Sequence, residues 1–121
     1  MFTSQEAYIT CHRFLQAIWE ANSALYDNDL PGLLGDMQLT TDGTPFDPAL
    51  KNDWREATLE QDEMSVEFAF DSMLRFLKIY VDLGEAETND ITRVIFYINS
   101  NEGLAFAKWI ELTDRFRQEE N

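Results

Sequence analysis

The feature that most constrains this chain is a pair of stretches in which apolar residues recur at the spacing of an α-helix. Positions three and four apart lie on one face of a helix, so each stretch predicts a long helix with one buried side. Thr3 and Glu6 fit a capping box before the first helix, which should end near Asn22, and Gly84 is a suitable stop for the second. The apolar positions are Ala7, Tyr8, Cys11, Phe14, Leu15 and Ile18 in the first stretch, and Val66, Ala69, Phe70, Met73, Phe76, Leu77 and Tyr80 in the second.

The two stretches also align with each other, at a constant offset of 62 residues. Arg13–Leu15 matches Arg75–Leu77, and farther along the chain Trp54 matches Trp109 across a shorter loop. Any two amphipathic helices can be aligned, but that does not explain the matched tryptophans. The sequence therefore predicts an internal duplication.

We predict an all-α fold, a single domain of six helices over residues 1–121. It is built from two pseudo-repeated halves, about residues 4–60 and 64–117, each with a long helix, a short helix, a loop and a final helix. Polar residues and prolines mark the starts of the shorter helices, because short polar side chains cap N-termini and proline fits the first turn. The expected starts are Asp27 or Asp29, Asp47 followed by Pro48, and Asn101.

Residues 91–98 carry a conflict between local preference and context. The run Val94–Ile98 has strong β propensity. The duplication pairs this segment with a helical one, and Asn89 or Asp90 can cap a helix there, so we predict a helix. At the end of the chain, residues 118–121 should be frayed.

An excess of acid is the strongest feature of the composition. The chain has 23 Asp and Glu residues against nine Lys and Arg, a net charge of −14 at pH 7, whereas a small domain carries a magnitude of about 2–8. Repulsion between like charges excludes nucleic acid and anionic membranes as partners and favours a basic protein. Solubility alone is the simpler explanation of the excess.

The sequence predicts a cytoplasmic protein in a reducing compartment. No apolar run approaches the roughly 20 residues that a membrane helix needs, and the first residues lack the basic segment of a secretory signal. Cys11 is the one cysteine, so no internal disulfide and no cysteine-built zinc site are expected.

Groups for nucleophilic catalysis are scarce. His12, the one histidine, directly follows Cys11, and neighbours in a helix point about 100° apart, so the two cannot face each other as base and thiol. Cys11 also belongs to the buried stripe, where a thiol is usually inert. We therefore expect no enzyme activity and no cofactor.

Carboxylates supply one enzymatic alternative. Glu63 and Glu67 stand four residues apart, and Glu87 and Asp90 three apart; such pairs on facing helices can hold Mg²⁺. The spacing resembles that of all-α, Mg-dependent nucleotide pyrophosphohydrolases. It departs from their pattern because the first block begins with Asp62 and has three residues between its acids where the family has two.

The same run of carboxylates predicts a docking surface for a basic partner. No Lys or Arg occurs from Glu56 to Leu74. On a continuous helix the acids at positions 56, 60, 63, 67 and 71 would fall within roughly 80° of arc. A focused negative potential speeds association with a cationic partner, although a merely solvated acidic face would have the same sequence. The predicted partner-binding residues are Glu56, Glu60, Asp62, Glu63 and Glu67 in the run, with Asp42 and Asp47 in the preceding loop.

A third alternative is a regulatory or scaffolding dimer, which would need an exposed apolar patch. Trp19, Tyr26 and Phe46 lie off the main stripes and could form one. We expect these aromatic residues to be buried under the loops instead.

Several short motifs in the first half form a recognisable set. They are Ser4–Tyr8, Arg13–Leu15, Leu33–Leu39, Asp42–Pro45, Asp47–Ala49 and Asp53–Trp54. Over about residues 4–57 this set resembles a widespread bacterial family of small acidic helical proteins, the immunity proteins of contact-dependent growth inhibition and related polymorphic toxin systems. The second half fits through the duplication.

The resemblance implies a cytoplasmic inhibitor that binds one cognate toxin domain, often a nuclease. It implies no catalytic residues to carry over. The shared motifs would define the fold, and the toxin-binding residues would lie in the variable acidic surface.

Overall fold

The computed structural model describes residues 2–41, 43–82 and 89–120, which form six helices and one very small sheet. The predicted all-α fold is confirmed. In chain order the elements are β1 (Phe2–Thr3), α1 (Ser4–Ala21), α2 (Asp29–Met37), α3 (Ala49–Ala57), β2 (Glu63–Met64), α4 (Val66–Asp82), α5 (Asn89–Ser100) and α6 (Glu102–Glu120).

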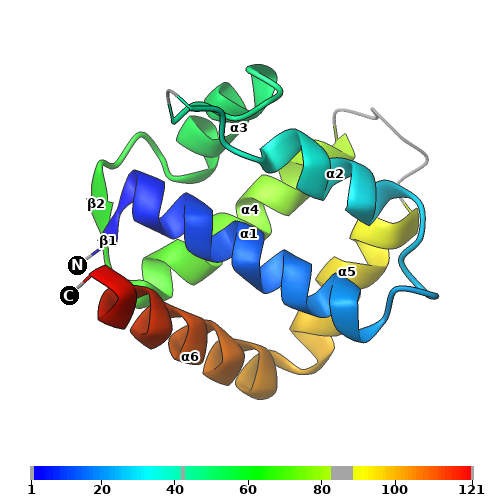
Figure 1. Cartoon of the computed structure of the whole chain (residues 1–121). Helices are drawn as coiled ribbons and strands as arrows, with labels where there is room; N and C mark the ends of the chain where they lie inside the picture. The colour runs from blue at the N-terminus through cyan, green and yellow to red at the C-terminus, as the bar shows by residue number, and fades with distance from the viewer. Residues whose placement is uncertain (1, 42, 83–88, 121) are drawn as a thin grey trace.

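The two long helices predicted from the apolar stripes, α1 and α4, form the centre of the domain (Figure 1). α1 contacts α2, α4 and α6, while α4 also contacts α3, α5 and α6. β1 pairs antiparallel with β2, so that Phe2 lies opposite Met64. The two ends of the chain lie close together (Figure 1), and the Arg117 guanidinium stacks 4.9 Å from the Phe2 ring.

The expected start of α1 and the expected helix at residues 91–98 are both confirmed. The Glu6 N–H donates to the Thr3 hydroxyl, and the Glu6 carboxylate accepts from the Thr3 N–H, as a capping box requires. α5 spans residues 91–98 and buries Ile91, Val94 and Ile98. Burial of this face overrides the local β preference.

The predicted cap of α2 is wrong. Asn28 occupies the N-cap position, rather than Asp27 or Asp29, and its side chain makes no capping bond. Asp90 on α5 takes over the task, because its carboxylate accepts hydrogen bonds from the N–H groups of Asn28, at 2.8 Å, and Leu30, at 3.3 Å. The cap cannot be recognised from the local sequence, because Asp90 lies in the other half of the chain.

Two further boundaries differ from the sequence prediction. α3 begins at Ala49 with Pro48 at the N-cap position, one residue later than predicted from Asp47. The Asp47 carboxylate still accepts a hydrogen bond from the Ala49 N–H at 3.0 Å. α6 continues as helix to Glu120, so the predicted fraying of residues 118–121 is wrong for the residues that are described. An ion pair of 2.8 Å between Glu119 and Arg13 ties the last turn of α6 to α1. The predicted stop at Gly84 lies outside the described residues.

Two clusters of edge-to-face aromatic rings fill the core in matched positions. In each cluster a tryptophan contacts one ring from α1 and one from α4, at centroid distances between 5.4 and 5.8 Å. The rings from the two long helices differ by the offset of 62 seen in the sequence. The clusters are Trp54 with Tyr8 and Phe76, and Trp109 with Phe70 and Phe14.

The two tryptophans also make matched hydrogen bonds. The Trp54 Nε1–H donates to the Ser4 carbonyl at 3.1 Å, and the Trp109 Nε1–H donates to the Val66 carbonyl at 3.2 Å. Ser4 and Val66 again differ by 62 positions and begin the two long helices. Such paired contacts are what an internal duplication predicts.

Candidate docking surface

Five of the predicted partner-binding residues lie together where α3 ends and α4 begins. All five are exposed, and we call this group the acidic end. Its members are Glu56 on α3, Glu60 and Asp62 in the connecting turn, Glu63 on β2 and Glu67 in the first turn of α4.

The other two predicted residues are not part of this group. Asp47 is half-buried at the opposite end of α3, where it caps the helix. Asp36 lies nearby, and burial together with the charge of Asp47 raises the pKa of Asp36 above its ordinary value. Asp42 lies outside the described residues.

The acidic end is not one face of a continuous helix, so that part of the sequence prediction is wrong. α3 stops at Ala57, and both Leu59 and Glu60 adopt left-handed backbone conformations, with φ of 54° and 59°. Residues 63–64 then form β2 before α4 starts. The carboxylates therefore project from the end of α3, a turn, a strand and the start of α4 rather than from one helical stripe.

A Schellman motif closes the turn at the end of α3. The Leu59 N–H donates to the Glu56 carbonyl at 3.1 Å, and the Glu60 N–H donates to the Arg55 carbonyl at 2.9 Å. The Thr58 hydroxyl donates to the same Arg55 carbonyl at 3.1 Å. These bonds satisfy the last carbonyls of α3 and hold the turn in a fixed position.

Arg55 neutralises one of the five carboxylates, although the run itself contains no cation. Its Nη2 donates to Glu60 Oε1 at 3.1 Å, between side chains that are 60% and 74% exposed. Glu56, Asp62, Glu63 and Glu67 form no ion pair within the part of the chain that the structure describes. Four uncompensated carboxylates therefore remain at the acidic end.

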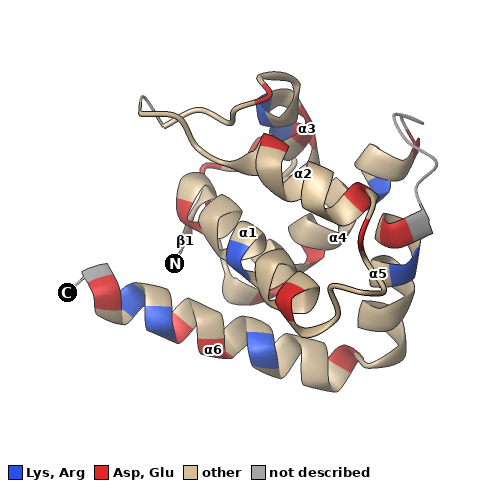
Figure 2. Cartoon of the chain, turned by 45° about the vertical axis from the view of Figure 1, so that its right-hand side comes forward, with Lys and Arg blue, Asp and Glu red and all other residues tan. Residues whose placement is uncertain are grey.

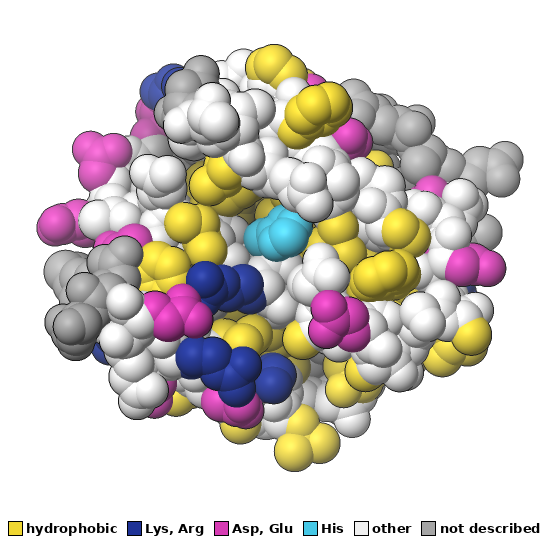
Figure 3. All heavy atoms as spheres, in the orientation of Figure 1, with side chains coloured by type: hydrophobic (Ala, Val, Ile, Leu, Met, Phe, Trp, Pro, Cys, Tyr) yellow, Lys and Arg dark blue, Asp and Glu magenta, His cyan; other side chains and the backbone are white. Residues whose placement is uncertain are grey.

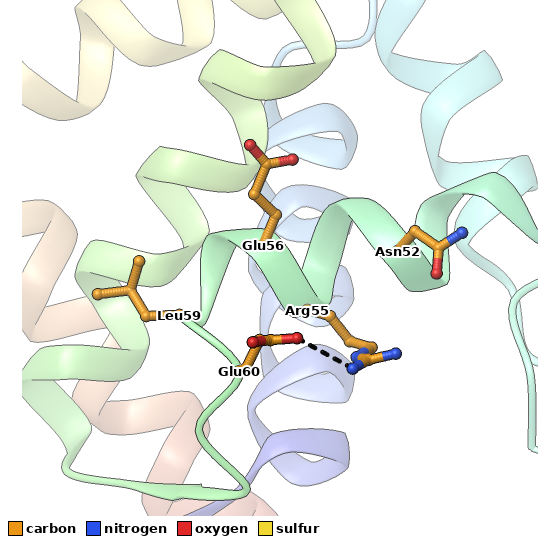
Figure 4. Close-up of a pocket in the computed structure, with 5 residues that line it drawn as sticks. All are labelled: Asn52, Arg55, Glu56, Leu59 and Glu60. Atoms are coloured by element: carbon orange, nitrogen blue, oxygen red, sulfur yellow. Dashed lines mark hydrogen bonds and ion pairs between the residues drawn. The ribbon is translucent and has the colours of Figure 1, made fainter.

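A hollow of about 430 Å³ opens on the outer side of α3, beside the ion pair (Figure 4). We call it the α3 hollow. Figure 4 shows its lining residues along α3 and in the turn that follows. They are Asn52, Arg55, Glu56, Leu59 and Glu60.

A second hollow, of about 370 Å³, lies between the start of α1, the loop after α2 and α3, and shares Arg55 with the first. Its floor is rigid because two aromatic side chains are tied to the backbone. The Tyr8 hydroxyl donates to the Met37 carbonyl at 2.7 Å, and Trp54 donates to Ser4. Two hollows therefore adjoin α3, and the hydrogen bond from Trp54 to Ser4 ties this helix to the start of α1.

Cations gather on a different part of the molecule. A groove of about 380 Å³ between α1 and α6 is lined by His12 and by Arg13, Lys108 and Arg115. Figure 3 shows Lys and Arg side chains beside the single histidine on this face, and Figure 2 shows the basic positions along α6. Glu20 and Glu119 line the same groove, and its three cations form ion pairs with Glu119 or Glu111, so acidic and basic side chains are mixed here.

The alternative magnesium site is not assembled from the described residues. Asp90 is only 2% exposed, and its carboxylate accepts hydrogen bonds from the α2 backbone and from Arg93. Glu63 and Glu67 belong to the acidic end, and Glu87 lies outside the described residues. No cluster of three metal-ligating side chains occurs among the residues that are described.

The surroundings of Cys11 and His12 indicate structural rather than catalytic roles. Cys11 is fully buried, and burial raises the pKa of its thiol above the ordinary value. The His12 Nε2 lies 3.1 Å from the Leu34 carbonyl, where it can act as a donor. Neither side chain contacts the other as a base contacts a nucleophile.

The aromatic residues proposed for a dimer patch are divided. Tyr26 is buried, and Trp19 is half-buried against the core, as expected. Phe46 is 71% exposed, so the prediction of burial is wrong for this residue. The three side chains therefore do not form one exposed apolar patch.

None of the helices in the described residues is long and apolar enough to cross a bilayer. No protein-family model, curated protein or solved structure matches this chain.

Proposed function

We propose that this protein is a cytoplasmic immunity protein, which binds and neutralises one cognate bacterial toxin domain, a nuclease, through its acidic end. The observation that carries the proposal is the group of four exposed carboxylates without an ion-pair partner among the described residues, on and around the closed turn that follows α3. The motif resemblance over residues 4–57 supports the same conclusion.

The chemistry of a nuclease explains why an acidic surface would inhibit it. A nuclease must hold a polyanion, so the cleft that receives the phosphates is basic. Glu56, Asp62 and Glu63 can occupy the positions of phosphates along that cleft or cover its rim. Their field would steer the two proteins together and raise the association rate, most strongly at low salt.

Rigidity favours tight binding by this surface. The backbone that carries these carboxylates is held by hydrogen bonds, so on binding it loses little conformational freedom and mainly the side chains become ordered. Here the frame is the Schellman turn, the β1–β2 pair and the anchored Trp54 side chain. The acidic end therefore needs little rearrangement to bind.

Co-expression with the C-terminal domain encoded immediately upstream tests this function. In a bacterial host the domain alone should stop growth and degrade nucleic acid, and this chain should restore growth and form a one-to-one complex with it. An unrelated acidic protein of similar net charge is the control. A housekeeping operon at that position, or nuclease activity unchanged by a molar excess of this chain, would count against the proposal.

A further inference from the structure

Leu59 combines two features that do not serve the stability of the monomer. Its backbone is left-handed, with φ of 54°, a conformation that is unfavourable for a residue with a Cβ atom and is usually filled by glycine at this point of a Schellman motif. Its side chain is 61% exposed, so burial in the core does not compensate for the strain.

The turn itself does not need the leucine side chain. The bonds that close it run between backbone groups of residues 54–60 and through the Thr58 hydroxyl and the Arg55–Glu60 ion pair. A glycine at position 59 would keep all of these bonds. The hydrogen bonds of the turn therefore do not explain why residue 59 is leucine.

The two aligned halves of the chain differ at this turn. When Trp54 is aligned with Trp109, Leu59 corresponds to Asp114, which lies inside the continuous helix α6. α3 instead stops at Ala57 and reverses through Leu59. The surface around Leu59 thus belongs to one half only.

The surroundings of Leu59 suit a protein interface. It lines the α3 hollow together with Glu56, Glu60 and Arg55, so that an apolar side chain stands among charged ones (Figure 4). Binding energy in interfaces is concentrated in a few desolvated anchors, which a polar rim shields from water. The charge of that rim calls for a partner with Lys or Arg around an apolar pocket.

We propose that Leu59 is the apolar anchor of the docking surface and inserts into an apolar pocket on the basic toxin domain, with the unpaired Glu56 meeting a cation at its edge. This inference rests on the proposed function and adds the residue that holds the complex together. An apolar anchor acts after encounter, so Leu59 should govern the dissociation rate, whereas the carboxylates govern the association rate.

The test compares Leu59→Gly with Leu25→Gly in binding kinetics against the upstream toxin domain. Leu25 is a matched control, because it is also a turn leucine, 57% exposed, and lies at the far end of α1. Leu59→Gly should dissociate at least about 10-fold faster than the parent with association changed less than about twofold. Leu25→Gly should dissociate like the parent.

The melting temperature separates an anchor from a structural residue. Since glycine relieves the left-handed strain, Leu59→Gly should melt at or above the parent temperature. If the parent binds and Leu59→Gly dissociates no faster than the parent, Leu59 is not the anchor, and the proposed function is unaffected. A fall of more than about 3 °C would also overturn it, because the leucine would then serve the fold. Failure of the parent itself to bind would overturn the proposed function.

Discussion

Arg55 and Glu60 are joined twice, once through the backbone and once through their side chains. The Glu60 N–H donates to the Arg55 carbonyl at 2.9 Å, and the Arg55 guanidinium donates to the Glu60 carboxylate at 3.1 Å. In a Schellman motif these two positions often carry an apolar contact. Here the contact is ionic and exposed, and the neighbouring Leu59 side chain is also exposed and lines the α3 hollow.

Breaking this ion pair should hardly change stability. Glu60→Gln keeps the backbone bond and the shape of the side chain but removes its charge, and exposed pairs contribute about 0.2–1 kcal/mol. Urea unfolding of the parent, Glu60→Gln, Arg55→Ala and the double variant should give a coupling energy below about 1 kcal/mol. A coupling above about 2 kcal/mol would mean that the pair, rather than the backbone bonds, holds the turn.

Asp90 should matter far more, because it caps a helix from a distance. Asp90→Ala leaves the N–H groups of Asn28 and Leu30 without their acceptor and removes one of the hydrogen-bond partners of Arg93. We expect a loss of about 2 kcal/mol in the free energy of unfolding. Asp90→Asn, which retains an acceptor oxygen, should lose less. Equal losses for the two variants would show that the carboxamide cannot cap α2.

The Asp90 carboxylate also predicts a pH dependence. Burial alone would raise its pKa, but the hydrogen bonds from Asn28, Leu30 and Arg93 outweigh burial and hold the pKa below its ordinary value. A lowered pKa in the folded state gives stability that is present above the unfolded pKa of about 3.9 and is lost as the pH falls through the folded pKa. The stability gap between the parent and Asp90→Asn should therefore shrink in acid. A gap that widens below about pH 4 would contradict this.

The thiol of Cys11 should be unreactive in the folded protein. It is fully buried, and its raised pKa leaves almost no thiolate at neutral pH. Iodoacetamide at pH 8 should label the native protein far more slowly than the protein in guanidinium, as mass spectrometry can show. Labelling of the native protein within minutes would mean that α1 opens locally or that its environment differs.

The two tryptophans offer a test of the duplication. Trp54→Phe and Trp109→Phe each lose one Nε1–H bond to a carbonyl at the start of a long helix, while the edge-to-face ring contacts can remain. Each should cost about 1–3 kcal/mol, and the two losses should be similar. The free energies of unfolding come from urea titration. A large loss of unfolding free energy in only one variant would mean that the two tryptophans contribute unequally to stability despite their matched geometry.

The helices were predictable because their signals are local. The apolar stripes and the capping box at Thr3 depend on residues a few positions apart, and they placed α1 and α4 correctly. The cap of α2 was not predictable, because its acceptor, Asp90, is about 60 residues away. Fraying of the C-terminus was predicted because chain ends are usually poorly ordered. The ion pair between Arg13 and Glu119 joins residues far apart in the sequence, so the local sequence did not reveal it.

For the candidate site, composition predicted the carboxylates but not their geometry. The spacing of Glu56, Glu60 and Glu63 suited one helix, and nothing local announced that the chain would reverse at Leu59. Leucine is uncommon in a left-handed conformation, so Leu59 gives no indication in the sequence that the chain turns there. Arg55 could have been recognised as the partner of Glu60 only once that turn was known.

The central claim is that the acidic end binds a basic partner. The variant Glu56→Lys, Asp62→Lys, Glu63→Lys leaves the Arg55–Glu60 pair intact and should fold, because Glu56 lies near a helix C-terminus, where a cation is favoured. The control is Glu20→Lys, Asp27→Lys, Asp82→Lys, which makes the same change in net charge at exposed sites away from the acidic end.

The decisive measurement is the association rate of both variants with the upstream toxin domain at about 0.02 M and about 0.5 M salt. Reversal at the acidic end should slow association at least about 10-fold at low salt, and the gap to the parent should narrow at high salt as the charges are screened. The control should stay within about twofold of the parent at both. If the two triple variants associate equally fast at both salt concentrations, the acidic end is a solvated surface and the claim is wrong.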